Sequence, residues 1–292
     1  RRGLVLTDQV GLVGAAVSDL PDIGALCAQF SGGKASLSFS SLRADALTPQ
    51  LVRALAQSGV KTATIAPEAG SERLRRVINK GLSEADVLSA AEVLVAHGIP
   101  NLKLYFMIGL PTETDADVQA IATLVKRIKH VFLAVSRSRH AIGTITAGVG
   151  CFVPKPFTPF QWAAMEEVGR LKAKLRIIKG ELGRVANVRV HADVPRWAYV
   201  QAVLSRGDRR TADILTRVHA LKTVPLNADF FVHRERDTEE LLPWDFIDHG
   251  VTNAFLKQEY RRALEGRPGI ACGGGSCRLC GACTDEAGRP GS

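Results

Sequence analysis

Two apolar segments, each running into a glycine-containing turn, constrain this chain more than any other feature. They are Thr62–Ser71 and Asn101–Thr114, and helical segments at Ser71–Lys80 and Ser83–His97 lie between them. Each apolar run is typical of a short buried strand. A strand, a helical crossover and a second strand predict two parallel neighbours in one sheet. Both turns then lie at the carboxyl ends of their strands, where α/β folds bind ligands.

Further strands are predicted on both sides of this pair. Val10–Val17 is apolar and rich in β-forming residues, Ala35–Ser41 alternates apolar and serine side chains, and Ile142–Val153 is a glycine-rich run. Thr48-Pro49 is a helix start, with Thr48 as N-cap. A long helix is predicted from Thr114 to about Ile128, followed by a polar connection over His130–His140.

The part of the chain after Val153 is richer in helical patterns. A strand at Val188–Val194 places His191 and Asp193 on one face, where they either touch substrate or form a surface pair. The other predicted elements are helices at Gln161–Leu182, Trp197–Ser205, Thr211–His219 and Thr252–Leu264, and a short strand at Asn227–Phe231.

Three ordered motifs resemble the radical S-adenosylmethionine superfamily. They are Pro67–Arg75 with Asn79–Gly81, then Tyr105–Glu113, then Val153–Pro159. In that family the fourth barrel strand ends in a Glu-x-Gly-Ser-like turn beside the ribose and methionyl part of the cofactor. The fifth strand ends in Gly-x-Pro-x-Glu, and the edge of the sixth lies near adenine. The chain looks most like uncharacterised members that often carry an N-terminal B12-binding (cobalamin) domain.

The resemblance implies an α/β fold: a partial (β/α) TIM-type barrel of parallel strands, an α-rich C-terminal extension and a Cys-rich tail. It assigns residues 1–160 to the barrel, as strands two to six of the family, 161–265 to the extension and 266–292 to the tail. The family's first strand would lie upstream of Val10, and the chain opens with Arg1 close to an apolar run. We therefore expect an N-terminally truncated fragment.

The same resemblance implies the cofactors. Family members hold a [4Fe–4S] cluster through Cys-x3-Cys-x2-Cys and cleave S-adenosylmethionine reductively to a 5′-deoxyadenosyl radical, which modifies a substrate. That spacing does not occur in this sequence, so the cluster ligands are expected upstream and the fragment is expected to be inactive alone. Cobalamin, through an upstream domain, and an electron donor such as flavodoxin or ferredoxin are also implied. The substrate stays open among small molecules, RNA and protein.

The residues that match cofactor positions lie at or near predicted strand ends. The expected cofactor-binding set is Ser18, Asp19, Ser40, Arg43, Glu68, Gly70, Ser71, Met107, Gly109, Phe152 and Val153. We expect Ser18, Asp19, Ser40, Arg43, Glu68 and Gly109 to line one cavity. Arg43 could bind the methionyl carboxylate, or form a salt bridge with Asp45 or Glu68. Ser18 and Asp19 could instead only cap a helix.

The tail carries a second cysteine motif. Cys272, Cys277, Cys280 and Cys283 lie within twelve residues, a spacing that suits Zn²⁺ or a second iron–sulfur cluster. Glycines between them let the backbone wrap around a metal. We expect the four thiolates to converge on one site that is independent of the radical-generating cluster.

Charge and hydropathy leave two other classes of function open. The net charge of +9 permits an anionic partner, although the charge is spread along helix faces. One alternative is a non-radical barrel enzyme that binds a phosphorylated ligand at Gly70-Ser71, with Glu68 and Glu113 as its acid–base pair. The other is a basic RNA-binding module with a zinc knuckle. No apolar run approaches the roughly 20 residues of a membrane span, so no membrane partner and a cytoplasmic location are expected.

Overall fold

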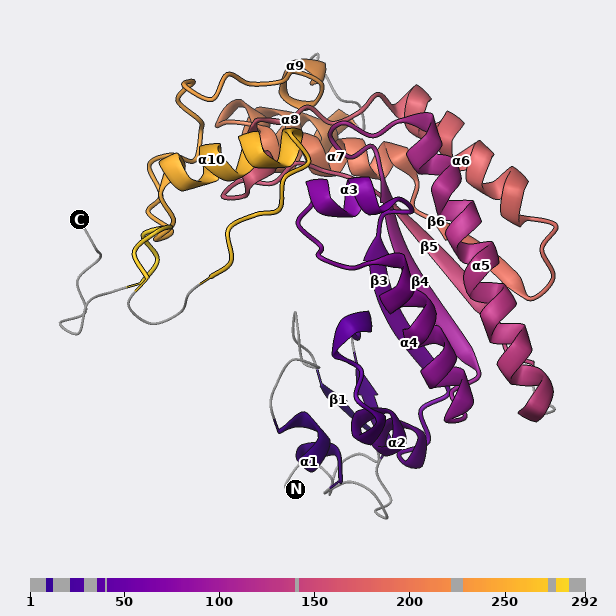
Figure 1. The fold of residues 1–292 in the computed structure, drawn as a ribbon. Helices are drawn as coiled ribbons and strands as arrows, with labels where there is room; N and C mark the ends of the chain where they lie inside the picture. Colours follow the sequence, from indigo (N-terminus) through magenta and orange to yellow (C-terminus); the bar gives the residue numbers. More distant parts are fainter. Residues whose placement is uncertain are drawn as a thin grey trace.

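A computed structural model describes residues 9–12, 22–28, 36–39, 41–139, 142–221, 228–272 and 277–283. Its strands are all parallel and follow one another in chain order, as a two-stranded and a four-stranded sheet. The strands are β1 (Gln9–Leu12), β2 (Ser36–Phe39), β3 (Thr62–Glu68), β4 (Asn101–Ile108), β5 (Ile145–Cys151) and β6 (Val188–Ala192). The predicted parallel α/β architecture is confirmed (Figure 1).

Within the described residues, one isolated backbone bridge connects the two sheets. The segment after β2 pairs with β3 through Leu42 and Ile65, and the Leu42 amide donates to the Thr64 carbonyl over 2.8 Å. The strand order is therefore that of an incomplete (β/α) barrel, running from β1 to β6.

Helices separate the strands and then dominate the rest of the chain. They are α1 (Ile23–Ala28), α2 (Pro49–Gln57), α3 (Glu72–Val77), α4 (Glu84–Ala96), α5 (Asp115–Arg139), α6 (Val168–Leu182), α7 (Pro195–Arg206), α8 (Arg210–Leu221), α9 (Asp229–Val232) and α10 (Asn253–Leu264), with short 3-10 helices η3 (Ala44–Ala46) and η4 (Pro159–Trp162). The predicted helix starts are confirmed where side-chain caps mark them: Thr48 caps α2, and Ser83 with Asp86 forms a capping box on α4.

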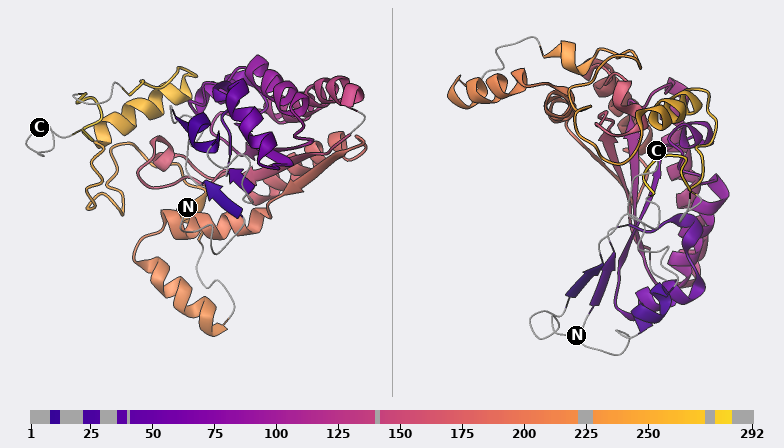
Figure 2. Two further views of the ribbon diagram at one scale, coloured as in Figure 1. Left: turned by 90° about the horizontal axis from the view of Figure 1, so that it is seen from below. Right: turned by 90° about the vertical axis from the view of Figure 1, so that its left-hand side faces the viewer.

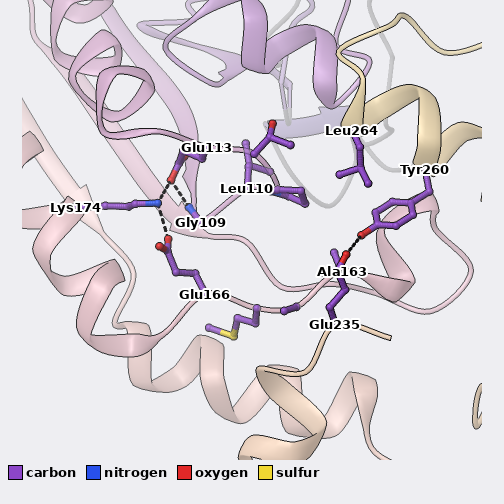
Figure 3. A pocket seen from close by; sticks show the side chains of 13 residues that line it. Gly109, Leu110, Glu113, Ala163, Glu166, Lys174, Glu235, Tyr260 and Leu264 are labelled. Atoms are coloured by element: carbon purple, nitrogen blue, oxygen red, sulfur yellow. Dashed lines mark hydrogen bonds and ion pairs between the residues drawn. The ribbon is translucent and has the colours of Figure 1, made fainter. Parts of the chain in front are cut away.

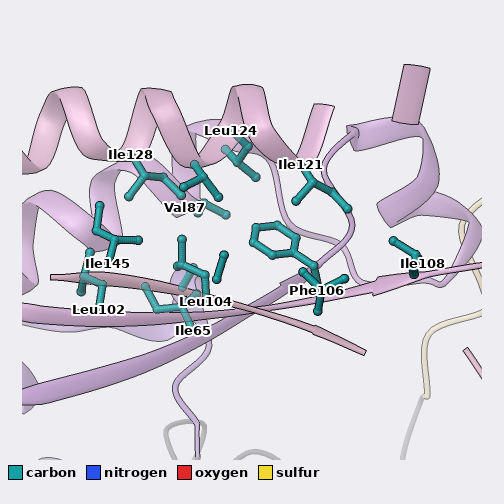
Figure 4. Packing of buried hydrophobic residues seen from close by; sticks show 14 of the residues in the cluster. Ile65, Val87, Leu102, Leu104, Phe106, Ile108, Ile121, Leu124, Ile128 and Ile145 are labelled. Atoms are coloured by element: carbon teal, nitrogen blue, oxygen red, sulfur yellow. The ribbon is translucent and has the colours of Figure 1, made fainter. Parts of the chain in front are cut away.

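One face of the four-stranded sheet is buried and the other is open. In β4, Leu102, Leu104, Phe106 and Ile108 are each at most 1% exposed and pack toward helices α4 and α5 (Figure 4). The alternate residues of β4 point to the opposite face and are polar or only partly buried. Figure 2 shows α4 and α5 on one side of the sheet.

Two sequence predictions about elements are wrong. The connection expected over His130–His140 is helical up to Arg139, because Phe132 and Ser136 continue the buried stripe of α5. The strand expected at Asn227–Phe231 is, in its described part, the helical turn α9. A helical turn satisfies these backbone groups locally, whereas a strand needs a neighbour.

The helix expected from Gln161 begins later than predicted. Residues 159–162 form η4, an irregular strap follows, and α6 starts only at Val168. The strap matters for the site, because Ala163, Met165 and Glu166 line a cavity there.

The C-terminal part packs on the carboxyl ends of the strands. A second apolar cluster joins Leu74, Leu110 and Phe152 of the barrel to Trp244 and Tyr260. The tail folds back as well: the Thr252 amide donates to the Cys280 carbonyl, and the Gly269 amide donates to the Asn79 side chain. Among the residues that the structure describes, no helix is both long enough and apolar enough to cross a membrane.

Candidate functional site

The candidate site is a cavity of about 350 Å³ on the open face of the sheet, at the carboxyl ends of β3 to β6. It is lined by Ser41, Ala66, Glu68, Tyr105, Phe106, Met107, Gly148, Val149, Gly150, His191 and Asp193. The strand register brings these residues together, because Tyr105 pairs with Gly148 and Gly148 pairs with His191 across three neighbouring strands. A volume in this range suits a small organic ligand.

Glu68 stands at the upper rim of this cavity in an unusual backbone conformation. Its φ of 67° lies in the left-handed region, and the register with β4 shifts between Ile65 and Glu68. Strain of this kind in a non-glycine residue is a feature of functional sites. Lys80 holds the carboxylate with an ion pair of 3.3 Å, so the side chain is oriented before any ligand arrives.

Two glycines of β5 keep the cavity open. A Cβ at Gly148 would lie 2.9 Å from the ring of Tyr105, and one at Gly150 would lie 3.3 Å from Oδ2 of Asp193. Any larger residue would therefore displace Tyr105 or fill the space in front of Asp193. The aromatic ring covers the glycine backbone and forms part of the floor.

Only some of the cofactor-binding residues expected after the first two strands lie in the described part of the chain. Ser18, Asp19 and Ser40 lie outside the described residues. Arg43 pairs with Asp45 through two hydrogen bonds, of 3.0 Å from Nε and 2.5 Å from Nη2, which is the ordinary salt bridge that the sequence left open. Its neighbour Ser41, rather than Arg43, lines the cavity.

Both residues of the Gly70-Ser71 turn make close contacts within the protein. The Ser71 hydroxyl accepts from the Leu74 amide as the N-cap of α3 and donates to Asp117 Oδ1 over 2.5 Å. A Cβ at Gly70 would lie 2.2 Å from the Ile121 backbone nitrogen in α5. A phosphate at this turn would meet the Asp117 carboxylate, which argues against the phosphorylated-ligand alternative.

Asp117 is itself a buried ionised group. Burial raises its pKa, but hydrogen bonds from Arg73, Ser71 and Thr114 outweigh burial and hold the pKa well below its usual range. The carboxylate thus ties the turn after β3 to the start of α5 and sets the position of the rim that carries Glu68.

Gly109 does not share the cavity of Glu68 and Met107, contrary to the prediction of one common cavity. It lines a second cavity of about 340 Å³ between the β4–α5 turn, the strap after η4 and α10 (Figure 3). The Gly109 amide donates to Glu113 Oε2 over 2.7 Å, and Lys174 donates to the same oxygen and to Glu166, each over 2.6 Å.

Two members of the Glu113–Lys174–Glu166 group are almost completely shielded from solvent, and Glu166 is 21% exposed. Lys174 and Glu113 are 4% and 1% exposed. Burial raises the pKa of Glu113 despite the neighbouring ammonium, whereas the two carboxylates outweigh burial and raise the pKa of Lys174. Lys174 therefore stays charged and braces the turn that ends β4.

Phe152 and Val153 lie in the core rather than on either cavity. They are 9% and 8% exposed, and the ring of Phe152 stacks edge-on against Phe160 at 5.7 Å. Their place near adenine, which the resemblance implied, stays a prediction.

The cysteines fall into two groups. Cys151 packs against the helix-covered core, and burial with nearby carboxylates raises the pKa of its thiol to about 11, so it is a poor metal ligand. In the tail, burial and the thiols of Cys280, Cys272 and Cys277 raise the pKa of Cys283. Within the described residues, no three His, Cys, Asp or Glu side chains converge closely enough to hold a metal ion.

Sequence reasoning missed several residues of the site. Tyr105, Gly148 and Gly150 needed the register of β4 against β5, although the alternation of Asn101–Ile108 already placed Tyr105 beside Met107 on one face. Lys174 was missed too. Its position between Leu171 and Leu175, in the apolar stripe of α6, was the available signal.

The chain is similar in sequence to one known family and to another protein. The model of the radical SAM superfamily matches residues 5–125, a range that contains Glu68, the Gly70-Ser71 turn and Met107. The chain is 35% identical over 209 residues to the uncharacterized protein MJ0966 of Methanocaldococcus jannaschii, which covers 71% of this chain and 43% of that protein.

The chain thus spans less than half the length of this curated relative. Among solved structures, the crystal structure of Streptococcus suis SuiB matches with a TM-score of 0.44 and 13% identity, over 67% of this chain and 42% of that one. The radical SAM superfamily is thus the family that residues 5–125 match, and the parallel strand order, with Glu68 and Met107 at the strand ends, is consistent with that match.

Proposed function

We propose that this chain forms the S-adenosylmethionine-binding part of a radical SAM enzyme, with the nucleoside of the cofactor in the cavity at the carboxyl ends of β3 to β6. The observation that carries the proposal is that Glu68, strained and oriented by Lys80, lines one cavity with Met107 and the glycines of β5. The match of residues 5–125 to the radical SAM superfamily supports the class of enzyme.

The residues present fit a nucleoside. The cavity has the volume of a small-molecule site, and Gly150 leaves space in front of Asp193. Carboxylates accept hydrogen bonds only, so Glu68 and Asp193 suit ribose hydroxyls or an amino group. Met107 adds a polarizable apolar surface for the base.

The residues do not fit an iron–sulfur cluster. No cysteine lines the cavity among the residues described there, and Cys151 faces the helices. When bound, S-adenosylmethionine supplies the reactive 5′-deoxyadenosyl group, and the protein positions it and excludes water. In this chain the positioning falls to Glu68, held by Lys80, and to the β4 turn, held by Lys174.

Equilibrium dialysis with S-adenosylmethionine tests the proposal. Replacing Glu68→Gln removes a charge-assisted hydrogen bond and should weaken binding by about tenfold. Gly150→Val should abolish binding by filling the cavity. Glu92→Gln, an exposed carboxylate on α4, is the matched control and should bind like the parent protein. Equal affinity for Glu68→Gln and the parent would exclude this cavity.

We propose in addition that the tail cysteines hold a metal, as Zn²⁺ or a second iron–sulfur cluster. The spacing of Cys272, Cys277, Cys280 and Cys283 supports this, and so does the anchoring of the tail by Thr252 and Asn79. Elemental analysis should show metal lost from Cys280→Ala/Cys283→Ala and retained in Cys27→Ala. Metal content unchanged by the double substitution would rule the site out.

A further inference from the structure

The second cavity, between the β4–α5 turn, the strap after η4 and α10, shares no lining residue with the cavity of Glu68. Its volume is about 340 Å³. Sites for small organic molecules have volumes in this range, whereas a single water takes up only about 30 Å³. The second cavity is therefore large enough for a ligand of its own.

One buried carboxylate oxygen at this cavity has no hydrogen-bond partner. Glu113 lines the cavity and is 1% exposed (Figure 3). Its Oε2 accepts from the Gly109 amide and from Lys174, whereas its Oε1 has no donor among the described residues. Buried carboxylate oxygens are almost always paired, because a missing donor costs free energy. Glu113 Oε1 is therefore the atom to which a bound ligand would donate a hydrogen bond.

The charges around Glu113 are not balanced. Lys174 is buried and divides its hydrogen bonds between Glu113 and Glu166. Arg170 lies 3.6 Å from Glu166 but is 65% exposed, so water screens its charge. Burial raises the pKa of Glu113 despite the ammonium, because Lys174 compensates the buried charge only in part. A cationic donor at Oε1 would complete that compensation, whereas both carboxylates would repel an anion.

The other walls of the cavity add a third carboxylate and apolar surface. Figure 3 shows Glu235, which accepts a hydrogen bond of 2.9 Å from the Tyr260 hydroxyl, on the side of the cavity away from Glu113. Leu110 and Leu264 belong to the wall of the same cavity. Leu264 is 41% exposed although its side chain is apolar. A hydrocarbon chain that covered it would remove apolar surface from water.

We propose that the second cavity is a binding site for an aliphatic amine. The ammonium of the ligand donates to Oε1 of Glu113, and its hydrocarbon chain packs against Leu110 and Leu264. A hydrogen bond between two charged groups is roughly twice as strong as one between neutral groups, so a protonated amine fits this position better than a neutral donor of the same size. The inference does not rest on the proposed function, because the two cavities are lined by different residues.

Methionine NMR on the full chain tests this site in the absence of S-adenosylmethionine. Met165 lines this cavity and Met107 lines the other, so methyl-labelled methionine reports on each of them. The ligands are butylamine, which is protonated at neutral pH, and 1-butanol, which has the same hydrocarbon chain without the charge. We expect butylamine to shift the Met165 signal in a saturable way and to leave Met107 in place. Binding of 1-butanol should be weaker by about tenfold or more.

Two variants and a control make the test specific. Glu113→Gln can still accept from Gly109 and Lys174 with its amide oxygen, but it puts a nitrogen that donates where Oε1 accepts. It should weaken butylamine binding by about tenfold or more. Ala164→Phe fills the cavity without changing a charge and should abolish binding. Glu92→Gln, exposed on α4, is the matched control and should bind like the parent protein.

The Met107 signal shows whether each variant is folded. Tighter binding of butylamine than of 1-butanol, lost in Glu113→Gln and kept in Glu92→Gln, supports the amine site. The inference is overturned if butylamine gives no saturable shift of Met165, if 1-butanol binds equally well, or if Glu113→Gln binds like the parent. Since S-adenosylmethionine binding is followed at Met107, failure of the cofactor site and failure of the amine site give different results.

Discussion

At the scale of single residues, Lys174 is the side chain on which the β4 turn depends. Its ammonium donates to Glu113 and Glu166 at 2.6 Å, and Glu113 accepts the Gly109 amide with the same oxygen. Removing one partner of such a group leaves buried charge uncompensated, which costs far more than an exposed ion pair is worth.

We predict that Lys174→Met destabilises the protein by about 3 kcal/mol at neutral pH. The cost should shrink in acid. Burial already raises the pKa of Glu113, and this pKa rises further without the cation. In Lys174→Met, the contribution of protonated Glu113 to stability is therefore complete below the ordinary pKa of a glutamate and is lost as pH rises through the pKa of the folded protein. Urea unfolding at pH 5 and pH 8 measures this.

Two variants make that test specific. Lys172→Met, exposed on the same helix, should leave stability within about 0.5 kcal/mol of the parent. Adding Glu113→Gln to Lys174→Met should recover part of the loss, because one buried charge is removed. A cost for Lys174→Met that does not depend on pH would contradict the account.

At the scale of elements, the turn from β3 into α3 sets the rim of the candidate site. Gly70 lies so close to α5 that any side chain would push the two apart. We predict that Gly70→Ala costs about 2 kcal/mol or more, the usual penalty for overpacking. It should also weaken S-adenosylmethionine binding, because Glu68 moves with the turn.

Gly169→Ala is the matched glycine control. Gly169 lies in α6 with nothing within 4 Å of an added Cβ, so alanine should stabilise the helix by about 0.5–1 kcal/mol. Thermal melts of both variants compare them directly. Equal stability of the two would mean that the close approach at Gly70 does not exist in solution.

Asp117 gives the opposite pH dependence from Glu113. The pKa of Asp117 is held below the ordinary value. Its contribution to the stability of the protein is therefore complete above about pH 4 and is lost as pH falls through the pKa of Asp117 in the folded protein. Asp117→Asn should therefore cost about 2 kcal/mol at pH 7 and progressively less below pH 4. A stability difference that grows in acid would show that the Ser71–Asp117–Arg73 network is absent.

A structural feature could be predicted from the sequence where residues close together in the chain determine it. Capping at Thr48 and Ser83, and the strands around Glu68 and Met107, were predictable because a few adjacent residues determine them. The full length of α5 and the helical turn α9 depend on packing partners far away in sequence. The cavity depended on register between strands, which no local pattern fixes.

At the scale of the molecule, the C-terminal part is attached to the barrel by buried arginines. Arg206 is fully buried, donates to the carbonyls of Ala163 and Arg234, and accepts from Arg236 with its own carbonyl. Burial and the neighbouring guanidinium groups of Arg236 and Arg234 lower its pKa to about 10. The strap beside Lys174 is thereby tied to α7.

We predict that Arg206→Met costs about 2–3 kcal/mol, because the buried carbonyl of Ala163 and the partly buried carbonyl of Arg234 lose their donors. Hydrogen exchange should quicken at residues 159–165 and 231–236 before the rest of the chain. Arg209→Met, at an exposed position, is the control and should change neither. Uniform exchange across the chain in Arg206→Met would show that the strap is not held in this way.

The central claim, that S-adenosylmethionine binds in the cavity of β3 to β6, has a direct test. The chain contains two methionines: Met107 lines this cavity and Met165 lines the other. Methyl-labelled methionine therefore gives two NMR signals, which a Met107→Leu variant assigns. We predict that S-adenosylmethionine shifts the Met107 signal in a saturable way and leaves Met165 in place. A shift of Met165 alone, or no shift at millimolar cofactor, would contradict the claim.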